Sequence, residues 1–454
     1  MIVCVVLAAV VWWGLPKSSD YGLGAVQHLS DGTTLEIRQI AFTPTNFTFN
    51  YRGGGRLARI VAPLLPRKLA GRFWPQTGSV GFGTDGSSNL FVITAHGSGA
   101  PGWWSDLRRL IVFDDQGNLF DACFGASTIG FPGEVMHGWQ VRSFPRRTRM
   151  LGLRFISETQ GNRWVNAAEL KIRNPAYAIY PQWQAEFWPV TKADGDLSVT
   201  LSQFQSGVTQ PPGGFRLGAE LSPRATRMVF GFAQKGRPAD NWRVQKLVIS
   251  DATGNHWSPW LDSSDLGSSG ATNGTVEFLG ALWPGESAWK LAVEVVRSGE
   301  FGPEELWEAP PISLPGPGLL TDLTNSWAHD GVMVRLAGLS SPNTDHPGEF
   351  KWIAKWWGDD KNKVYALALK LSSEWKGHRL TVARVRDQDD REVEVVQHAN
   401  QDYAEQALFL KPAESARELK LTLALQRSRF VQFLARPEFV GLGTTNSPAR
   451  PPGN

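Results

Sequence analysis

One pattern of residues occurs three times along the chain. In its middle copy, Trp242 opens an alternating apolar segment that runs into the turn Asp251-Ala-Thr-Gly-Asn255. Equivalent turns begin at Asp114 and Asp387, each after a tryptophan and an alternating segment. The copies are about 130 to 140 residues apart, which is the size of a whole domain rather than of a solenoid repeat. The pattern therefore predicts three tandem domains, here called modules.

Two further signatures recur with a similar period. A proline-containing turn precedes an alternating segment at Pro145, Pro284 and Pro412. An Asp-Gly pair opens each copy at Asp31, Asp194 and Asp330. The interval between the first two Asp-Gly pairs is longer than the next one, which indicates an insertion at 52–75 in the first copy.

The segments between these signatures are typical of β-structure. The sequence contains 47 glycines and 29 prolines, and few stretches have a helical period. Each module holds about seven short strands, as expected of a two-sheet sandwich. We predict an all-β fold of three tandem antiparallel β-sandwich modules after a short N-terminal hydrophobic segment. The expected divisions are a hydrophobic segment at 1–17, module 1 at 26–177, module 2 at 186–314, module 3 at 320–442 and a disordered tail at 443–454.

The modules resemble a known class of domain. The Asp-Gly opening, the turn Pro284-Gly-Glu-Ser287 and the Pro-rich closing strand at 310–314 are similar to immunoglobulin-like or fibronectin-III-like modules of bacterial envelope proteins. This resemblance implies an architecture and a location rather than an activity. The Cys…Trp…Cys spacing of true immunoglobulin domains is absent, since the cysteines are Cys4 and Cys123, and the strand topology stays open.

The N-terminus carries an uncharged apolar segment at 2–15. A helix of that length spans about 21 Å, less than the roughly 30 Å hydrocarbon core of a bilayer. No basic residue precedes it and no small-residue cleavage site follows it, as a signal peptide would require. We favour a retained membrane anchor, with the modules outside the cytoplasm. A cleaved signal peptide and a buried segment are the alternatives.

The insertion at 52–75 is basic and contains no acidic residue. Its cations are Arg52, Arg56, Arg59, Arg67, Lys68 and Arg72. One interpretation is a basic amphipathic segment that lies on the membrane surface. The other is a short cap on module 1 with solvated arginines, which we favour because Pro63 and Pro66 would interrupt a helix.

Paired tryptophans are the best sequence candidates for a binding surface. They are Trp103 with Trp104 and Trp356 with Trp357. Adjacent residues of a strand point to opposite faces, so one tryptophan of each pair should face away from the core. Such a ring could stack on a sugar or anchor a protein partner. Packing between modules is the alternative, and the one we favour.

Catalytic and cofactor motifs are weak. Gly81-Phe-Gly-Thr-Asp-Gly86 matches the dinucleotide fingerprint, but an alternating strand follows it instead of a helix. The eight histidines have no metal-ligand spacing, and Cys123 reads as a strand cysteine rather than a nucleophile. The turns at Asp114 and Asp387 offer oxygen ligands for calcium, yet tight turns favour the same residues. We predict no catalytic residue and no cofactor, with calcium as an alternative.

The charge balance completes the functional prediction. With 46 basic and 43 acidic residues, the chain has no global field that selects nucleic acid. We expect an exported, non-catalytic interaction or scaffold protein of the cell envelope, whose partner is an envelope protein or a polysaccharide. The alternatives are a carbohydrate-binding protein that uses the tryptophan pairs, and an enzyme whose carboxylates or histidines converge between modules.

Overall fold

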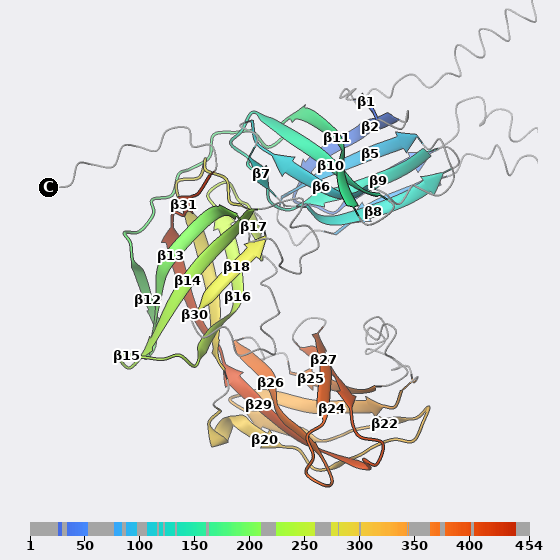
Figure 1. Cartoon of the computed structure of the whole chain (residues 1–454), viewed down its shortest axis with the longest axis vertical. Coiled ribbons are helices and arrows are strands. Elements are labelled where there is room, and N and C mark those ends of the chain that lie inside the picture. The colour runs from blue at the N-terminus through green and yellow to red at the C-terminus, as the bar shows by residue number, and fades with distance from the viewer. Residues whose placement is uncertain are drawn as a thin grey trace, which may run out of the picture.

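The computed structural model confirms the all-β class. The residues it describes are 26–29, 34–52, 77–83, 88–97, 107–115, 118–120, 123–131, 134–159, 163–209, 224–258, 274–279, 281–298, 301–342, 344, 364–372, 377–400 and 404–441. Within these ranges every regular element is a strand, apart from the single 3-10 turn η3 (Pro303–Glu305). The strands form three groups in space (Figure 1).

The first group is a pair of sheets. One has the order β1 (Val26–His28), β2 (Thr34–Thr43), β5 (Asn89–Gly97), β9 (Glu134–Val141) and β8 (Cys123–Phe131). The other has the order β11 (Arg163–Arg173), β10 (Met150–Thr159), β6 (Leu107–Phe113) and β7 (Leu119–Phe120). A core that includes Trp139 and Phe155 lies between them. The hairpin β3 (Phe47–Arg52) and β4 (Thr77–Phe82) supplies Phe47 to a smaller cluster with Phe91, so β5 is buried on both faces.

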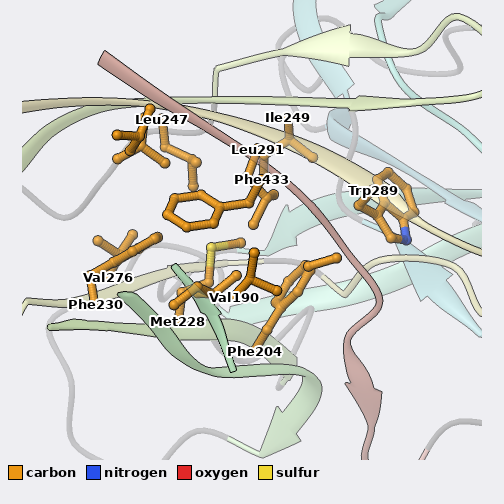
Figure 2. Packing of buried hydrophobic residues seen from close by; sticks show 14 of the residues in the cluster. Val190, Phe204, Met228, Phe230, Leu247, Ile249, Val276, Trp289, Leu291 and Phe433 are labelled. Carbon is orange, nitrogen blue, oxygen red and sulfur yellow. The ribbon is translucent and has the colours of Figure 1, made fainter. Parts of the chain in front are cut away.

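The second sheet pair encloses an aromatic core. One sheet contains β12 (Val190–Asp194), β13 (Leu197–Thr209), β14 (Arg224–Gln234), β15 (Arg237–Pro238), β18 (Thr275–Leu279) and β31 (Glu438–Phe439). The other has the order β17 (His256–Trp257), β16 (Trp242–Asp251), β19 (Trp289–Arg297) and β30 (Arg429–Ala435). Phe230 of β14 and Phe433 of β30 meet in this core, with ring centroids 5.9 Å apart (Figure 2).

The third sheet pair has a leucine-rich core. One sheet contains β22 (Leu320–Asp322), β23 (Ser326–His329), β24 (Val332–Ser340), β25 (Tyr365–Leu371), β28 (Glu405–Lys411) and β27 (Glu394–Asn400). The other contains β20 (Leu306–Glu308), β21 (Ile312–Ser313), β26 (His378–Asp387) and β29 (Glu418–Arg427). Strand β24 shows how the sequence selects the face: Val332, Val334 and Leu336 point into the core, while Met333 and Arg335 are exposed. Each fully buried aliphatic side chain stabilises the fold by about 1.5–3 kcal/mol.

Three strands occupy equivalent positions in the three sheet pairs. They are β10, β19 and β29, and each is paired on one side with the strand that leads into the repeated Asp turn, namely β6, β16 and β26. The other neighbour differs. Strand β11 follows β10 in the chain and pairs with it. In contrast, β20 and β21 follow β19 but pair with β29, while β30 follows β29 but pairs with β19. The second and third sheet pairs thus exchange their closing strands.

This exchange corrects two of the expected divisions. Residues 306–313, expected to close module 2, complete the third sheet pair, and residues 429–439, expected in module 3, belong to the second. Figure 1 shows β30 in the second group and β29 in the third, although only Ser428 separates them. The sequence could not reveal this. Both closing strands place an apolar residue opposite a leucine, Ile312 against Leu419 and Phe433 against Leu291, so either suits either sheet.

Candidate functional site

The repeated Asp turn is held by one hydrogen bond that all three copies share, from the N–H four residues on to the aspartate Oδ1. Asp251 Oδ1 accepts hydrogen bonds from the backbone N–H groups of Thr253 at 2.9 Å and Asn255 at 3.0 Å. Asp387 Oδ1 accepts them from Asp389 and Arg391, both at 2.9 Å. Asp114 Oδ1 accepts one from Asn118 at 2.8 Å. The aspartate therefore acts by holding its own turn, which agrees with the expected turn role. In the ranges given above, no three His, Cys, Asp or Glu side chains are grouped so as to hold a metal ion.

The middle copy of this turn also docks on the first sheet pair. Asn255 Nδ2 donates to the carbonyl oxygen of Phe144 at 2.9 Å, and the N–H of Phe144 donates to Asn255 Oδ1 at 3.3 Å. Arg146, buried beside it, donates to Thr253 O and Ser88 O, both at 2.8 Å. Burial lowers the pKa of the Arg146 guanidinium. In this joint, buried polar groups of both sheet pairs have hydrogen-bond partners. Separating the sheet pairs would leave these groups without their partners.

A two-pronged ion pair closes the same joint. Arg147 donates to both oxygens of Glu286, at 2.8 and 3.1 Å, and also to the carbonyl oxygens of Tyr180 and Pro181. The Glu286 carboxyl is almost fully buried. Burial raises its pKa to about 7, against the opposing effect of Arg147. Both residues lie in the repeated proline turns, so turns of equivalent position face each other.

The segment between the first two sheet pairs, residues 174–189, forms no helix or strand and is here called the strap. Its backbone is held along its length. Ser287 Oγ donates to Trp183 O at 2.6 Å, and the N–H of Glu186 donates to Leu434 O at 2.7 Å. Several large apolar side chains on the strap are nevertheless exposed: Tyr177, Ile179, Phe187 and Trp188.

Exposure on the strap is extreme at two positions. Ile179 is fully exposed, and Phe187 is 91% exposed. Exposed aromatic side chains on an ordered backbone are typical of protein-binding surfaces, because little entropy is lost when they are covered. In the sequence, most of this stretch falls between the expected modules at 26–177 and 186–314 or at their edges, and no function is expected of it. The sequence signal that could have identified this surface is the high density of aromatic residues between prolines. These residues follow neither a strand nor a helix period.

A second joint connects the second and third sheet pairs where the chain crosses between them. Glu294 of β19 forms an ion pair with Arg379 of β26; the Glu294 side chain is buried, and the Arg379 side chain is 11% exposed. Ser428, the residue between β29 and β30, donates from its Oγ to Glu294 Oε1 at 2.6 Å. The crossing residue itself is therefore fixed to a buried carboxylate.

A pocket of about 350 Å³ lies beside this crossing and is here called the crossing pocket. Its lining residues are Asp194, Asp330, Gly377, His378, Arg427, Ser428, Arg429 and Phe430. Asp194 Oδ2 accepts a 2.9 Å hydrogen bond from the N–H of Phe430. His378 Nε2 lies 2.9 Å from Asp330 Oδ2, and this hydrogen bond lowers the pKa of the Asp330 carboxyl.

The crossing pocket brings together carboxylates and a histidine from two sheet pairs, as the enzyme alternative requires. Their arrangement gives little support to proton transfer. Nε2 of His378 is engaged by Asp330, and Nδ1 is buried with no hydrogen-bond partner. Both ring nitrogens are therefore accounted for, Nε2 by its hydrogen bond with Asp330 and Nδ1 by its burial.

Most sequence-predicted binding residues lie outside the described ranges. These are Trp103, Trp104, Trp356 and Trp357, together with Arg56, Arg59, Arg67, Lys68 and Arg72. Arg52 ends β3, but the placement of its side chain is not described. The expected anchor at 2–15 is also outside, and among the described residues no helix is long and apolar enough to cross a membrane. After Gly81 and Gly83 the chain enters strand β5, as expected.

Comparison with known proteins adds little to this geometry. No protein-family model matches the chain, and no curated protein matches it. A solved structure titled the crystal structure of the conserved domain protein from Bacillus anthracis is 10% identical in sequence. The match covers 64% of this chain and 83% of that one, with a TM-score of 0.20. A likeness at that score supports no inference about fold or function.

Proposed function

We propose that the chain is a non-catalytic interaction scaffold of a cell envelope, made of three tandem immunoglobulin-like modules and anchored through residues 2–15. The observation that carries the proposal is the strap, which presents Ile179, Phe187 and Trp188 to solvent from a fixed backbone. The partner we propose is a protein, because large apolar side chains rimmed by polar residues are the usual anchors of protein interfaces.

The two joints support the scaffold part of the proposal. Arg147 with Glu286 ties the first sheet pair to the second, and Arg379 with Glu294 ties the second to the third. The exchanged strands add a backbone connection between the latter two. A protein held in this way keeps its binding surfaces at set distances, which lowers the entropic cost of binding a partner.

Site-specific crosslinking in the native cell tests this function. A photoreactive phenylalanine analogue replaces Phe187 in one strain and Met333, an exposed residue of β24, in a control strain. The proposal expects one envelope protein crosslinked in stoichiometric amount from position 187 and not from 333. The double substitution Ile179→Ser and Trp188→Ser should abolish that product. Equal crosslinking from both positions, or a product that survives the double substitution, would overturn the proposal.

A further inference from the structure

We propose that the crossing pocket binds a neutral, hydroxyl-rich ligand, namely one sugar unit of an oligosaccharide. This goes beyond the scaffold role, because it assigns a small-molecule site that does not involve the strap. The pocket depends on the strand exchange. Asp194 comes from the second sheet pair, Asp330 and His378 come from the third, and residues 427–430 come from the crossing itself.

The size of the pocket fits a small ligand. Its volume of about 350 Å³ lies at the lower end of the usual range for ligand sites, roughly 300–1,000 Å³. Two of the residues that line it, Arg427 and Phe430, are exposed to solvent. A single sugar ring can therefore enter while the rest of an oligosaccharide stays in solvent.

The charges of the lining select against ions. Two carboxylates, Asp194 and Asp330, are balanced by two guanidinium groups, Arg427 and Arg429. Arg429 lies 3.9 Å from Asp194 and 3.6 Å from Asp196, so its charge is compensated within the protein. A ligand with a net charge would be attracted by the two groups of opposite charge and repelled by the two of like charge. A neutral ligand pays no such cost.

Hydrogen-bonding groups in the pocket remain available. Among the described residues the Arg427 side chain makes no hydrogen bond or ion pair, although its charge contributes to the lowered pKa of Asp330. Its guanidinium offers five N–H donors. Asp330 uses Oδ2 for His378 and leaves Oδ1 for a ligand. A donor fork and a carboxylate oxygen together match the alternating donor and acceptor capacity of neighbouring sugar hydroxyls.

Phe430 supplies the apolar part of the site. Its side chain is 54% exposed, and its ring lies beside Gly377, where a Cβ would stand 3.6 Å from the ring. Gly377 has φ of +85°, a conformation that favours glycine. The ring is thus supported on one side by backbone, and the C–H face of a sugar can pack against the part that remains exposed.

Saturation-transfer NMR on the full chain tests the proposal. The probes are glucose, galactose, mannose and N-acetylglucosamine, with glutamate and inorganic phosphate as charged probes. At least one sugar should show transfer and the charged probes none. The variants Phe430→Ala and Arg427→Gln should each weaken sugar binding at least tenfold, whereas Phe187→Ala, on the strap, should leave it unchanged.

The variants also carry a control for folding. Phe430 and Arg427 are exposed, so thermal unfolding of both variants should match that of the parent. Absence of transfer to every sugar would overturn the proposal, as would preference for glutamate or phosphate, or sugar binding unaffected by either variant. None of these results bears on the strap, so failure here leaves the scaffold function to its own test.

Discussion

Glu294 of β19 forms a buried ion pair with Arg379 of β26, and this contact joins two sheet pairs that also share strands. The Glu294 carboxylate also accepts a hydrogen bond from Ser428 Oγ, at the point where the chain crosses from the third sheet pair to the second. The Glu294 side chain thereby holds both the neighbouring sheet, through Arg379, and the crossing residue Ser428. The stability of the joint should depend on it.

Replacing Glu294 with alanine should destabilise the protein strongly. It leaves the Arg379 guanidinium buried without its carboxylate, a change that costs about 3–5 kcal/mol in comparable sites. Glu277→Ala serves as the matched control, because the pair of Glu277 with Arg227 is more exposed and should be worth about 1 kcal/mol or less. Urea unfolding of the two variants gives both numbers. Equal losses would show that the buried pair has no special role.

Asn255→Ala should loosen the joint between the first and second sheet pairs. The side chain bonds both the N–H and the carbonyl oxygen of Phe144, and loss of buried hydrogen bonds costs about 1–3 kcal/mol. Amide hydrogen exchange at Phe144 measures the effect directly and should become faster. Asn118→Ala removes the equivalent turn contact with Asp114 and should leave exchange at Phe144 unchanged. Similar acceleration in both variants would contradict the assignment.

Glu286 should make the joint sensitive to pH. Burial raises its folded-state pKa from 4.5 to about 7, so the folded protein holds the proton more tightly than the unfolded chain does. The contribution of Glu286 to stability should therefore fall as pH rises from 4.5 to about 7 and change no further above that range. The Glu286→Gln variant should lack this contribution. Thermal unfolding of both proteins across pH 4.5–8 decides the matter, and identical pH profiles would count against it.

His137 should act with the opposite sign. It is buried in β9, stacked near Trp139, and burial with nearby His96 lowers its pKa from 6.5 to about 4. The unfolded chain takes up the proton first, so the contribution of His137 to stability should be lost as pH falls from 6.5 to about 4. Thermal unfolding across pH 4–7 measures this contribution. His137→Gln should flatten the dependence, while His256→Gln, at an exposed site, should keep it. A profile unchanged by His137→Gln would refute the prediction.

The local structure could be predicted from the sequence, whereas the pairing of distant strands could not. Asp251 and its equivalents Asp114 and Asp387 predict a turn, because the aspartate side chain accepts hydrogen bonds from the N–H groups that follow it. These contacts are confined to a few residues. Pairing between distant strands has no such local signature. Ile312 and Phe433 both suit a core position, and only the three-dimensional arrangement decides which sheet receives which. The crossing pocket could not be predicted for the same reason, because its lining residues come together only through the strand exchange.

The strap escaped prediction for a different reason. Periodicity identifies side chains that face a core, whereas Phe187 and Trp188 face solvent from an irregular backbone. Proposals placed on the tryptophan pairs, on the basic insertion and on the apolar N-terminus concern residues outside the described ranges and stay predictions.

The strand exchange is the central claim, and an engineered disulfide tests it most directly. Ala292 of β19 and Gln432 of β30 lie directly opposite each other and are both exposed, a geometry that antiparallel strands offer to a disulfide. Without exchange, Glu308 would occupy the place of Gln432. Val248 and Arg384 each lie three residues before the repeated aspartate; Val248 pairs with Ala292, and Arg384 pairs with Thr422, which faces Glu308. In a chain with Cys4 and Cys123 changed to serine, Ala292→Cys with Gln432→Cys should form a disulfide within the monomer. Ala292→Cys with Glu308→Cys should form none. A disulfide in the second pair, or one in the first pair only between two chains, would contradict the exchange.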